Sequence, residues 1–194
     1  ICNITGRPIR FARYTSRTLY PGVRNKDKDQ DRLKPIYKYY VKHIEDAESN
    51  IKSAERLIRE LKNRGKWPAK HNLKEWYGAS GSWWTDRDGN FLRCLTHTND
   101  PELITRHEVH EAPPDILVTN YSMLEYMLMR PLERPIFDRT VKWLQDNPNE
   151  NFFLVVDEAH LYRGAAGAEV ALLIRRLRSR LGIAADRLQV ICTS

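Results

Sequence analysis

The sequence has few cysteines and no long apolar run. Its three cysteines, Cys2, Cys94 and Cys192, are far apart and odd in number. This arrangement argues against a disulfide framework and favours reduced thiols, so we expect a cytoplasmic protein. No apolar run approaches the ~20 residues that a membrane-spanning helix needs. We therefore expect no membrane partner.

Neither end of the sequence resembles a natural terminus. The chain begins with Ile1 instead of methionine, and Ser194 directly follows a predicted strand. Arginines interrupt the first apolar residues, so the beginning of the chain does not resemble a signal peptide. We therefore expect an internal piece of a longer protein.

The sequence also lacks the phosphate-binding pattern Gly-x-x-x-x-Gly-Lys-Ser/Thr. Residues 78–82 (Gly-Ala-Ser-Gly-Ser) are rich in glycine, but they contain no lysine that could reach a phosphate, and we predict a loop there. Internal repeats and low-complexity segments are absent too. On its own, such a chain is expected to be inactive as a nucleotide hydrolase.

Charge is distributed unevenly along the chain, whose net charge is +7. The first 70 residues hold 18 Lys and Arg against 8 Asp and Glu, and the remainder holds 14 against 17. A basic region beside a nearly neutral one favours a polyanionic partner such as nucleic acid. The alternative is a solvated surface whose charge serves solubility.

The first part of the chain alternates between extended and helical patterns. Residues 7–13 alternate apolar and basic, as a half-buried strand does, and residues 14–31 are polar and predict a loop. One long helix is expected over residues 36–64, ending at Gly65. Its apolar residues recur at three- and four-residue spacings, namely Ile44, Ala47, Ile51, Ala54, Ile58 and Leu61. This heptad-type seam is expected to pack on the domain or on a partner protein.

The later part alternates strands and helices regularly. A strand is predicted at 91–95 and a short helix at 101–110. Further strands are predicted at 115–119, 151–156 and 188–192, and further helices at 120–129, 136–145 and 167–181. Strands that alternate with helices in this way indicate a parallel α/β architecture.

One apolar strand ends in two adjacent carboxylates, Asp157 and Glu158. In a parallel sheet, the last residues of a buried strand reach the carboxyl edge, where ligands bind. An aspartate there can hold Mg²⁺, and a neighbouring glutamate can orient and deprotonate an attacking water. The alternative is that the pair only caps the following helix.

The segment around these carboxylates resembles motif II of superfamily 2 helicases. Residues 157–167 (Asp-Glu-Ala-His-Leu-Tyr-Arg-Gly-Ala-Ala-Gly) are similar to the DEAH-x-Tyr-Arg-Gly-x-x-Gly pattern of a narrower helicase group. Residues 115–120 (Asp-Ile-Leu-Val-Thr-Asn) resemble motif Ib, although Tyr121 stands where the family often has proline. Thr193-Ser194 resembles the start of motif III.

The resemblance covers residues 113–194 and extends less clearly to the start of the chain. Either Arg10–Thr18 corresponds to the strand and loop after motif Ia, or residues 19–33 form a stretched motif Ia. The resemblance implies an α/β fold, a partial RecA-like domain with a mostly parallel sheet and a helical, Trp-rich insertion. Its parts would be residues 1–33 in the first motor domain, 34–112 in the insertion, and 113–194 in the motor domain with motifs Ib, II and the start of III.

The resemblance also implies cofactors and catalytic roles. ATP and Mg²⁺ would be the cofactors, bound through Asp157 and Glu158. Asp157 would hold the Mg²⁺ of the nucleotide, and Glu158 would act as the catalytic base. His160 would link the nucleotide to motif III and to the second RecA-like domain of the same parent chain.

The partner implied is nucleic acid, with DNA favoured over RNA. Thr119 and Asn120 would touch its backbone. Arg163 is a group that supports the site from behind, a group on the nucleic-acid side, or a surface arginine. The full-length parent would be an ATP-dependent helicase or translocase. The alternative is a non-catalytic module, derived from a motor domain, that binds nucleic acid or a partner.

Two weaker patterns lie in the proposed insertion. Trp67, Trp76, Trp83 and Trp84 stand among basic residues, an arrangement that can stack unpaired bases, although we favour a small core. Cys94-x-x-His97 and His107-x-x-His110 have spacings compatible with zinc, but one cysteine with three histidines is an uncommon donor set. After motif II, Arg176 and Arg180 share a helix face that we expect to be solvated, nucleic acid or the neighbouring motor domain being the alternatives.

Overall fold

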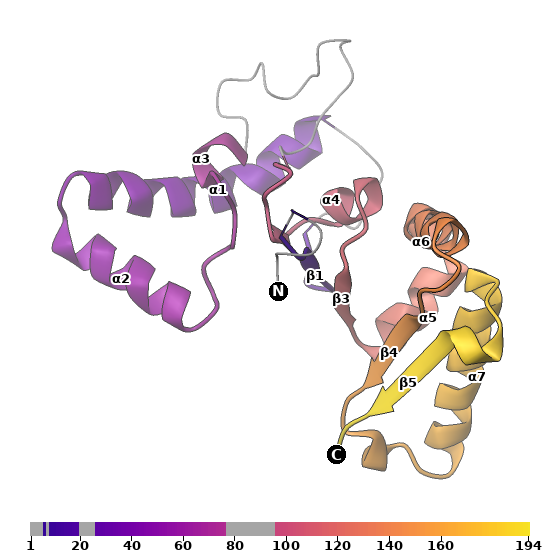
Figure 1. Ribbon diagram of the computed structural model, residues 1–194. Helices are drawn as coiled ribbons and strands as arrows, with labels where there is room; N and C mark the ends of the chain where they lie inside the picture. Colours follow the sequence, from indigo (N-terminus) through magenta and orange to yellow (C-terminus); the bar gives the residue numbers. More distant parts are fainter. Residues whose placement is uncertain (1–5, 7, 20–25, 77–95) are drawn as a thin grey trace. The chain divides into compact units, whose positions relative to one another are not determined.

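The computed structural model describes residues 6, 8–19, 26–76 and 96–194. The chain forms two compact units, Ile1–Val109 with Pro114–Val118, and His110–Pro113 with Thr119–Ser194 (Figure 1). Each unit combines helices with parallel strand pairs, which confirms the predicted α/β class. The predictions for residues 78–82 and 91–95 and for Trp83, Trp84 and Cys94 lie outside the described residues.

A three-stranded sheet with the order β2-β1-β3 belongs to the first unit. Its strands are β1 (Phe11–Tyr14), β2 (Glu102–Leu103) and β3 (Ile116–Thr119), the last residue of which falls in the second unit. β1 pairs in parallel with β2, with Phe11 opposite Glu102. The predicted first strand is thus confirmed with a later start.

The single helix predicted over residues 101–110 is wrong in its first half. The carbonyl of Pro101 accepts a hydrogen bond from the Phe11 amide at 2.8 Å, so the segment runs as β2 beside β1. Helix α4 (Arg106–Glu111) begins only after a capping box. In that box the Thr105 amide donates to Glu108 Oε2 at 2.9 Å, and the Glu108 amide donates to Thr105 Oγ1 at 3.2 Å.

The long helix predicted over residues 36–64 is also wrong, because the chain reverses within it. Two helices, α1 (Lys26–Glu48) and α2 (Lys52–Asn63), form a hairpin (Figure 1). Between them Asn50 adopts a left-handed conformation with φ of 61°, which asparagine tolerates better than most residues. The two halves of the apolar seam therefore lie on helices that pack against each other, and Ala54 is buried.

Helix α1 also begins within the stretch that was predicted to be a loop. Residues 26–29 form a run of alternating charges, and such runs occur in helices as well as in loops. Pro35 lies inside this helix.

The hairpin side of the first unit has its own small core. Leu33 and Trp76 are fully buried, and Leu19, Ile36 and Ile104 pack against them. Trp76 ends the short helix α3 (Leu73–Trp76). For this tryptophan the core prediction is confirmed.

A buried ion cluster joins the segment after the hairpin to the segment around β2. The ammonium group of Lys70 lies 3.2 Å from Asp100 Oδ2 and also contacts Glu108, and all three side chains are at most 1% exposed. The Asp100 carboxylate accepts from the amides of His71 and His97 at 2.7 and 3.0 Å. Every member is thus paired, as buried charges must be.

The second unit places helices around a two-stranded parallel sheet. Its strands are β4 (Phe152–Val156) and β5 (Leu188–Cys192). The helices are α5 (Tyr121–Met129), α6 (Arg134–Asp146) and α7 (Ala165–Leu181), with 3-10 turns η2 (Pro131–Glu133), η3 (Ala159–Leu161) and η4 (Ala185–Arg187). These bounds confirm the elements predicted from residue 120 onward to within two residues.

The helices of this unit are tied together by apolar and ionic contacts. Leu173, Leu177 and Leu181 of α7 are buried. Arg176 lies 3.3 Å from Glu125 of α5, and Arg180 lies 2.9 Å from Asp138 of α6. The two arginines predicted to form a solvated face therefore form ion pairs with the neighbouring helices.

One face of the β4–β5 sheet is apolar and exposed. Phe153 and Val155 are 61% and 59% exposed, and Ile191, which stands opposite Val155 in β5, is exposed as well. The alternate residues of β4 are half-buried. The strand predicted as buried is therefore covered on one side only. Among the described residues, no helix combines the length and the apolar character that a membrane span requires.

Candidate functional site

The carboxyl ends of β4 and β5 lie side by side. In the parallel register Val156 stands opposite Cys192, so Asp157 and Thr193 follow at neighbouring positions. The Thr193 amide donates to the Val156 carbonyl at 3.0 Å, and the Ala159 amide donates to the Thr193 carbonyl at 2.9 Å. These bonds extend the pairing beyond the strands and fix the two loops against each other.

The Thr193 hydroxyl holds the first carboxylate of the motif. It donates to Asp157 Oδ1 at 2.5 Å and accepts from the Glu158 amide at 3.3 Å. The Asp157 carboxylate is thereby oriented at an exposed edge. Thr193 was predicted to begin motif III but was not among the predicted site residues. The sequence feature that could have identified Thr193 as a site residue is its position directly after the strand that follows motif II.

Glu158 sits in a strained backbone conformation. Its φ and ψ of 51° and 42° are left-handed, a region that costs a residue with a side chain free energy and often marks functional sites. Its side chain is 56% exposed, with Oε2 3.3 Å from His160 Nδ1. A carboxylate and an imidazole in contact at an open edge can accept a proton from water.

The side chain of Arg163 contacts the backbone of this turn. Its Nε donates to the carbonyl of His160 at 3.1 Å, while the side chain remains exposed. Of the roles predicted for Arg163, the supporting role behind the site is the one that this contact fits. The residue therefore helps to fix the turn that carries His160.

The backbone requires glycine at both positions of the Tyr-Arg-Gly-x-x-Gly pattern, for a different reason at each. Gly164 precedes α7 with φ of 58° and ψ of −128°, which side-chain-bearing residues strongly avoid. A Cβ atom on Gly167 would lie 2.9 Å from the carbonyl oxygen of Tyr162. The first turn of α7 can approach the motif II loop only because residue 167 has no side chain.

Gly167→Ala is therefore expected to destabilise the junction between the motif II loop and α7 by about 1–3 kcal/mol, the usual cost of overpacking. Hydrogen exchange of the amides of residues 159–168 would measure the change. Ala166→Ser is the matched control, because Ala166 is exposed and adjacent. Equal exchange in the two variants would contradict the close contact.

Thr119 and Asn120 lie apart from this turn, at the junction of β3 and α5. Asn120 is the N-cap of α5, and its Oδ1 accepts from the Met123 amide at 2.8 Å, as the side chain of a capping asparagine does. The structure thus joins Glu158, His160 and Arg163 through direct contacts, and it joins Asp157 to them through Thr193. Thr119 and Asn120 reach the surface from a different element.

The donors at the motif II turn fit a divalent cation that prefers oxygen. Asp157 and Glu158 offer two exposed carboxylates, the ligand type that Mg²⁺ takes together with water and phosphate oxygens. Within residues 6, 8–19, 26–76 and 96–194, no three His, Cys, Asp or Glu side chains are grouped to hold a metal. The zinc hypothesis involves Cys94, which is outside those residues.

The chain has relatives among known proteins. It is 44% identical over 96% of its length to the Druantia protein DruE of Escherichia coli. It is 32% identical over half of its length to the uncharacterized ATP-dependent helicase MJ1574 of Methanocaldococcus jannaschii, and 31% identical over 56% to the uncharacterized ATP-dependent helicase YprA of Bacillus subtilis. No family model and no solved structure matches the chain.

The match covers a small part of each relative. The chain spans 10% of the length of DruE and 13% of each of the two helicases. The similarity therefore concerns one region of much longer proteins. These homologues support a helicase-related family for the chain.

Proposed function

We propose that this chain is the region of an ATP-dependent nucleic-acid helicase or translocase that carries motif II of the first RecA-like domain. One observation carries the proposal: Asp157, Glu158 and Thr193 meet at the carboxyl ends of two adjacent parallel strands. Ligands of open α/β sheets bind at this edge. The two relatives named as ATP-dependent helicases support the same conclusion.

The two carboxylates would have different roles. Asp157 would help to hold the Mg²⁺ that accompanies ATP, with one oxygen oriented by the Thr193 hydroxyl. Bound together, ATP and Mg²⁺ supply the phosphoryl group and the free energy of its transfer. Glu158 would orient the attacking water and accept its proton. Its exposed side chain suits this role, because water can reach it.

His160 and Arg163 would transmit the state of the site to its surroundings. The imidazole of His160 lies against the Glu158 carboxylate, and Arg163 holds the carbonyl of the same residue. A change at Glu158 would therefore move the turn that precedes α7. Such a linkage is what coupling to a second RecA-like domain requires.

The exposed face of the β4–β5 sheet supports a further layer of structure over it. Phe153 and Val155 would be expected under a further layer of structure, since contiguous exposed apolar patches mark contact surfaces. We propose that the rest of a longer chain covers them and supplies the phosphate-binding loop. Residues 1–33 and 113–194 would then belong to the motor domain, and residues 34–112, with most of the hairpin, to its insertion.

Nucleic acid, with DNA favoured, is the proposed partner. The basic first 70 residues can neutralise phosphates, and Thr119 and Asn120 stand where motif Ib would touch the backbone. Phosphate contacts of this kind position a strand without reading its sequence.

The test is movement on DNA by the full-length protein. We expect ATP-dependent displacement of streptavidin from an end-biotinylated single strand, and separation of a forked duplex by the same preparation. Displacement without strand separation would identify a translocase that is not a helicase. DNA binding without either activity would contradict the proposal and favour a non-catalytic binding module.

A further inference from the structure

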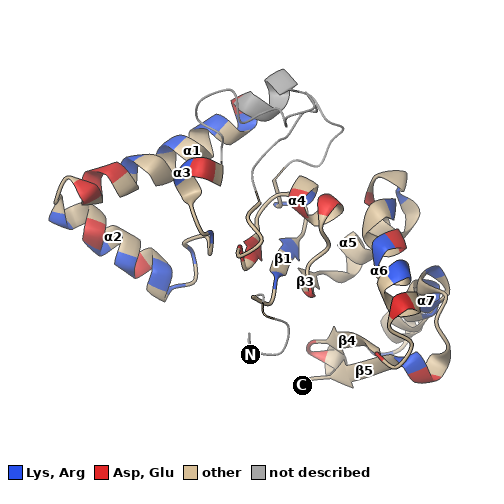
Figure 2. Cartoon of the chain, turned by 45° about the horizontal axis from the view of Figure 1, so that its top comes forward, with Lys and Arg blue, Asp and Glu red and all other residues tan. Residues whose placement is uncertain are grey.

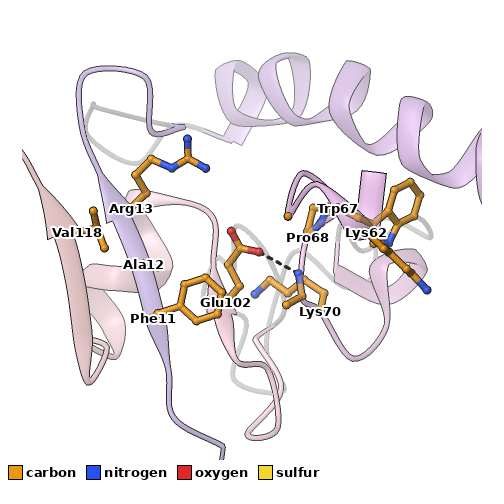
Figure 3. A pocket seen from close by; sticks show the side chains of 11 residues that line it. Phe11, Ala12, Arg13, Lys62, Trp67, Pro68, Lys70, Glu102 and Val118 are labelled. Carbon is orange, nitrogen blue, oxygen red and sulfur yellow. Dashed lines mark hydrogen bonds between the residues drawn. The ribbon is translucent and has the colours of Figure 1, made fainter. Parts of the chain in front are cut away.

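A second candidate site lies in the first unit, away from motif II. A pocket of about 620 Å³ opens between the β1–β3 side of the sheet and the segment that follows α2 (Figure 3). Phe11 and Arg13 reach it from β1, Val118 from β3, Lys62 from the end of α2, and Trp67 from the segment after it. The insertion and the sheet therefore both contribute to its walls.

The pocket presents flat apolar surface to solvent. Phe11 is 38% exposed and Val118 is 56% exposed. Trp67 is half-buried, and the ring of Tyr40 packs against it in a T-shaped contact with centroids 5.1 Å apart. Unlike Trp76, Trp67 is therefore positioned at a surface instead of inside the core. Planar ligands gain free energy by stacking on such rings.

The charge available to a ligand in this pocket is positive. Arg13 and Lys62 are exposed, and neither side chain forms a hydrogen bond or ion pair with any described residue. Glu102 contributes one negative charge to the lining, with its Oε2 held by the Ala69 amide at 2.9 Å (Figure 3), so the two free cations outnumber it. Lys70 is bound to Asp100 and Glu108. Arg64 and Lys66, both exposed, follow α2 in the sequence and add charge there. Figure 2 shows basic residues in blue at the end of α2.

The supporting phenol of Tyr40 is neutral at physiological pH, because an unperturbed tyrosine has a pKa of about 10. Burial raises the pKa of Tyr40 further, and Tyr39 and Glu102 act in the same direction. Tyr40 therefore adds no negative charge beside Trp67 at physiological pH.

Flat apolar rings beside free cations fit a ligand that is planar at one end and anionic at the other. The base and phosphate of an unpaired nucleotide have this chemistry. An acidic peptide would use the cations but would leave the rings without a stacking partner. We propose that the pocket binds a nucleotide of single-stranded nucleic acid, with the base on Phe11 or Trp67 and the phosphates at Arg13 and Lys62. This inference rests on the proposed function and adds a nucleic-acid site outside motif II.

The charge part of the proposal is tested with Arg13→Gln/Lys62→Gln in the full-length protein. Binding of a fluorescently labelled oligothymidylate is measured over a series of salt concentrations. We expect about tenfold weaker binding at low salt and a salt slope reduced by about 1.4, or ~0.7 for each lost phosphate contact. Lys52→Gln/Arg59→Gln is the matched control, since these exposed cations of α2 do not line the pocket.

The stacking part is tested on the wild-type protein, so that no aromatic residue has to be removed. An oligonucleotide containing 5-iodouracil is cross-linked by light, and the modified peptides are identified by mass spectrometry. We expect cross-links at Phe11 or Trp67, reduced in Arg13→Gln/Lys62→Gln and retained in the control variant. Cross-links confined to other regions, or equal salt slopes in both double variants, would overturn the proposal. So would competition by an acidic peptide but not by unlabelled oligonucleotide.

Failure of this proposal is distinguishable from failure of the proposed function. A wild-type protein that moves on DNA, with variants indistinguishable from the control, overturns the pocket alone. A wild-type protein that binds no single-stranded DNA overturns both.

Discussion

Glu158→Gln is expected to lower ATP turnover by the full-length protein at least about a hundredfold, the usual loss when a catalytic base is removed. Glutamine preserves the size of the side chain, so the strained turn and the contact of Thr193 with Asp157 should persist. Nucleotide binding should therefore remain. Steady-state hydrolysis and binding of a fluorescent ATP analogue would separate the two effects.

The matched control is Glu169→Gln, which removes an exposed carboxylate from α7 outside the motif II turn. Its turnover should equal that of the wild type. If Glu158→Gln hydrolyses ATP at the wild-type rate, Glu158 is not the base. In that case the adjacent carboxylates only shape the turn before α7.

Lys70→Met is expected to produce the largest loss of stability among single changes in the first unit. It leaves Asp100 and Glu108 buried without their cation, and breaking a buried ion pair in this way costs about 3–5 kcal/mol. The segment that bears both carboxylates should open more often. Hydrogen exchange of the amides of residues 96–108 in the full-length protein measures this opening.

Lys66→Met is the control for this prediction, because Lys66 lies in the same segment and is exposed. Its effect should stay within about 0.5 kcal/mol, as for most surface changes. Protection of residues 96–108 that is equal in the two variants would show that Lys70 does not neutralise the two carboxylates.

Local sequence patterns predicted the second unit well. β4, α7 and β5 are each marked by a continuous apolar run or a three- and four-residue spacing. Asn120 was recognisable as a cap because capping depends on contacts only three residues away. Elements determined by near neighbours in the sequence can be predicted from it.

The first unit was harder because single residues and distant contacts decide its structure. Asn50 reverses the chain inside a seam whose spacing fits one continuous helix equally well. The residues that pair with Lys70 lie 30 and 38 positions away, so no local pattern reveals them. Trp67 and Trp76 looked alike in the sequence, yet one lines a pocket and the other is buried.

At the motif II turn, the sequence predicted the residue types, and the structure adds the reasons for them. The contact of Thr193 with Asp157 follows from the register of two strands 36 positions apart. The left-handed backbone of Glu158 and the approach of Gly167 to Tyr162 could not be predicted from residue spacing. The approach of Gly167 depends on how α7 packs after the turn.

The most direct measurement is steady-state ATP hydrolysis by the full-length wild-type protein with increasing single-stranded DNA. If Asp157 and Glu158 serve a DNA-dependent motor, hydrolysis requires Mg²⁺ and rises with DNA to a plateau. A protein that binds the same DNA but hydrolyses no ATP at any DNA concentration would contradict the motor function proposed for this chain.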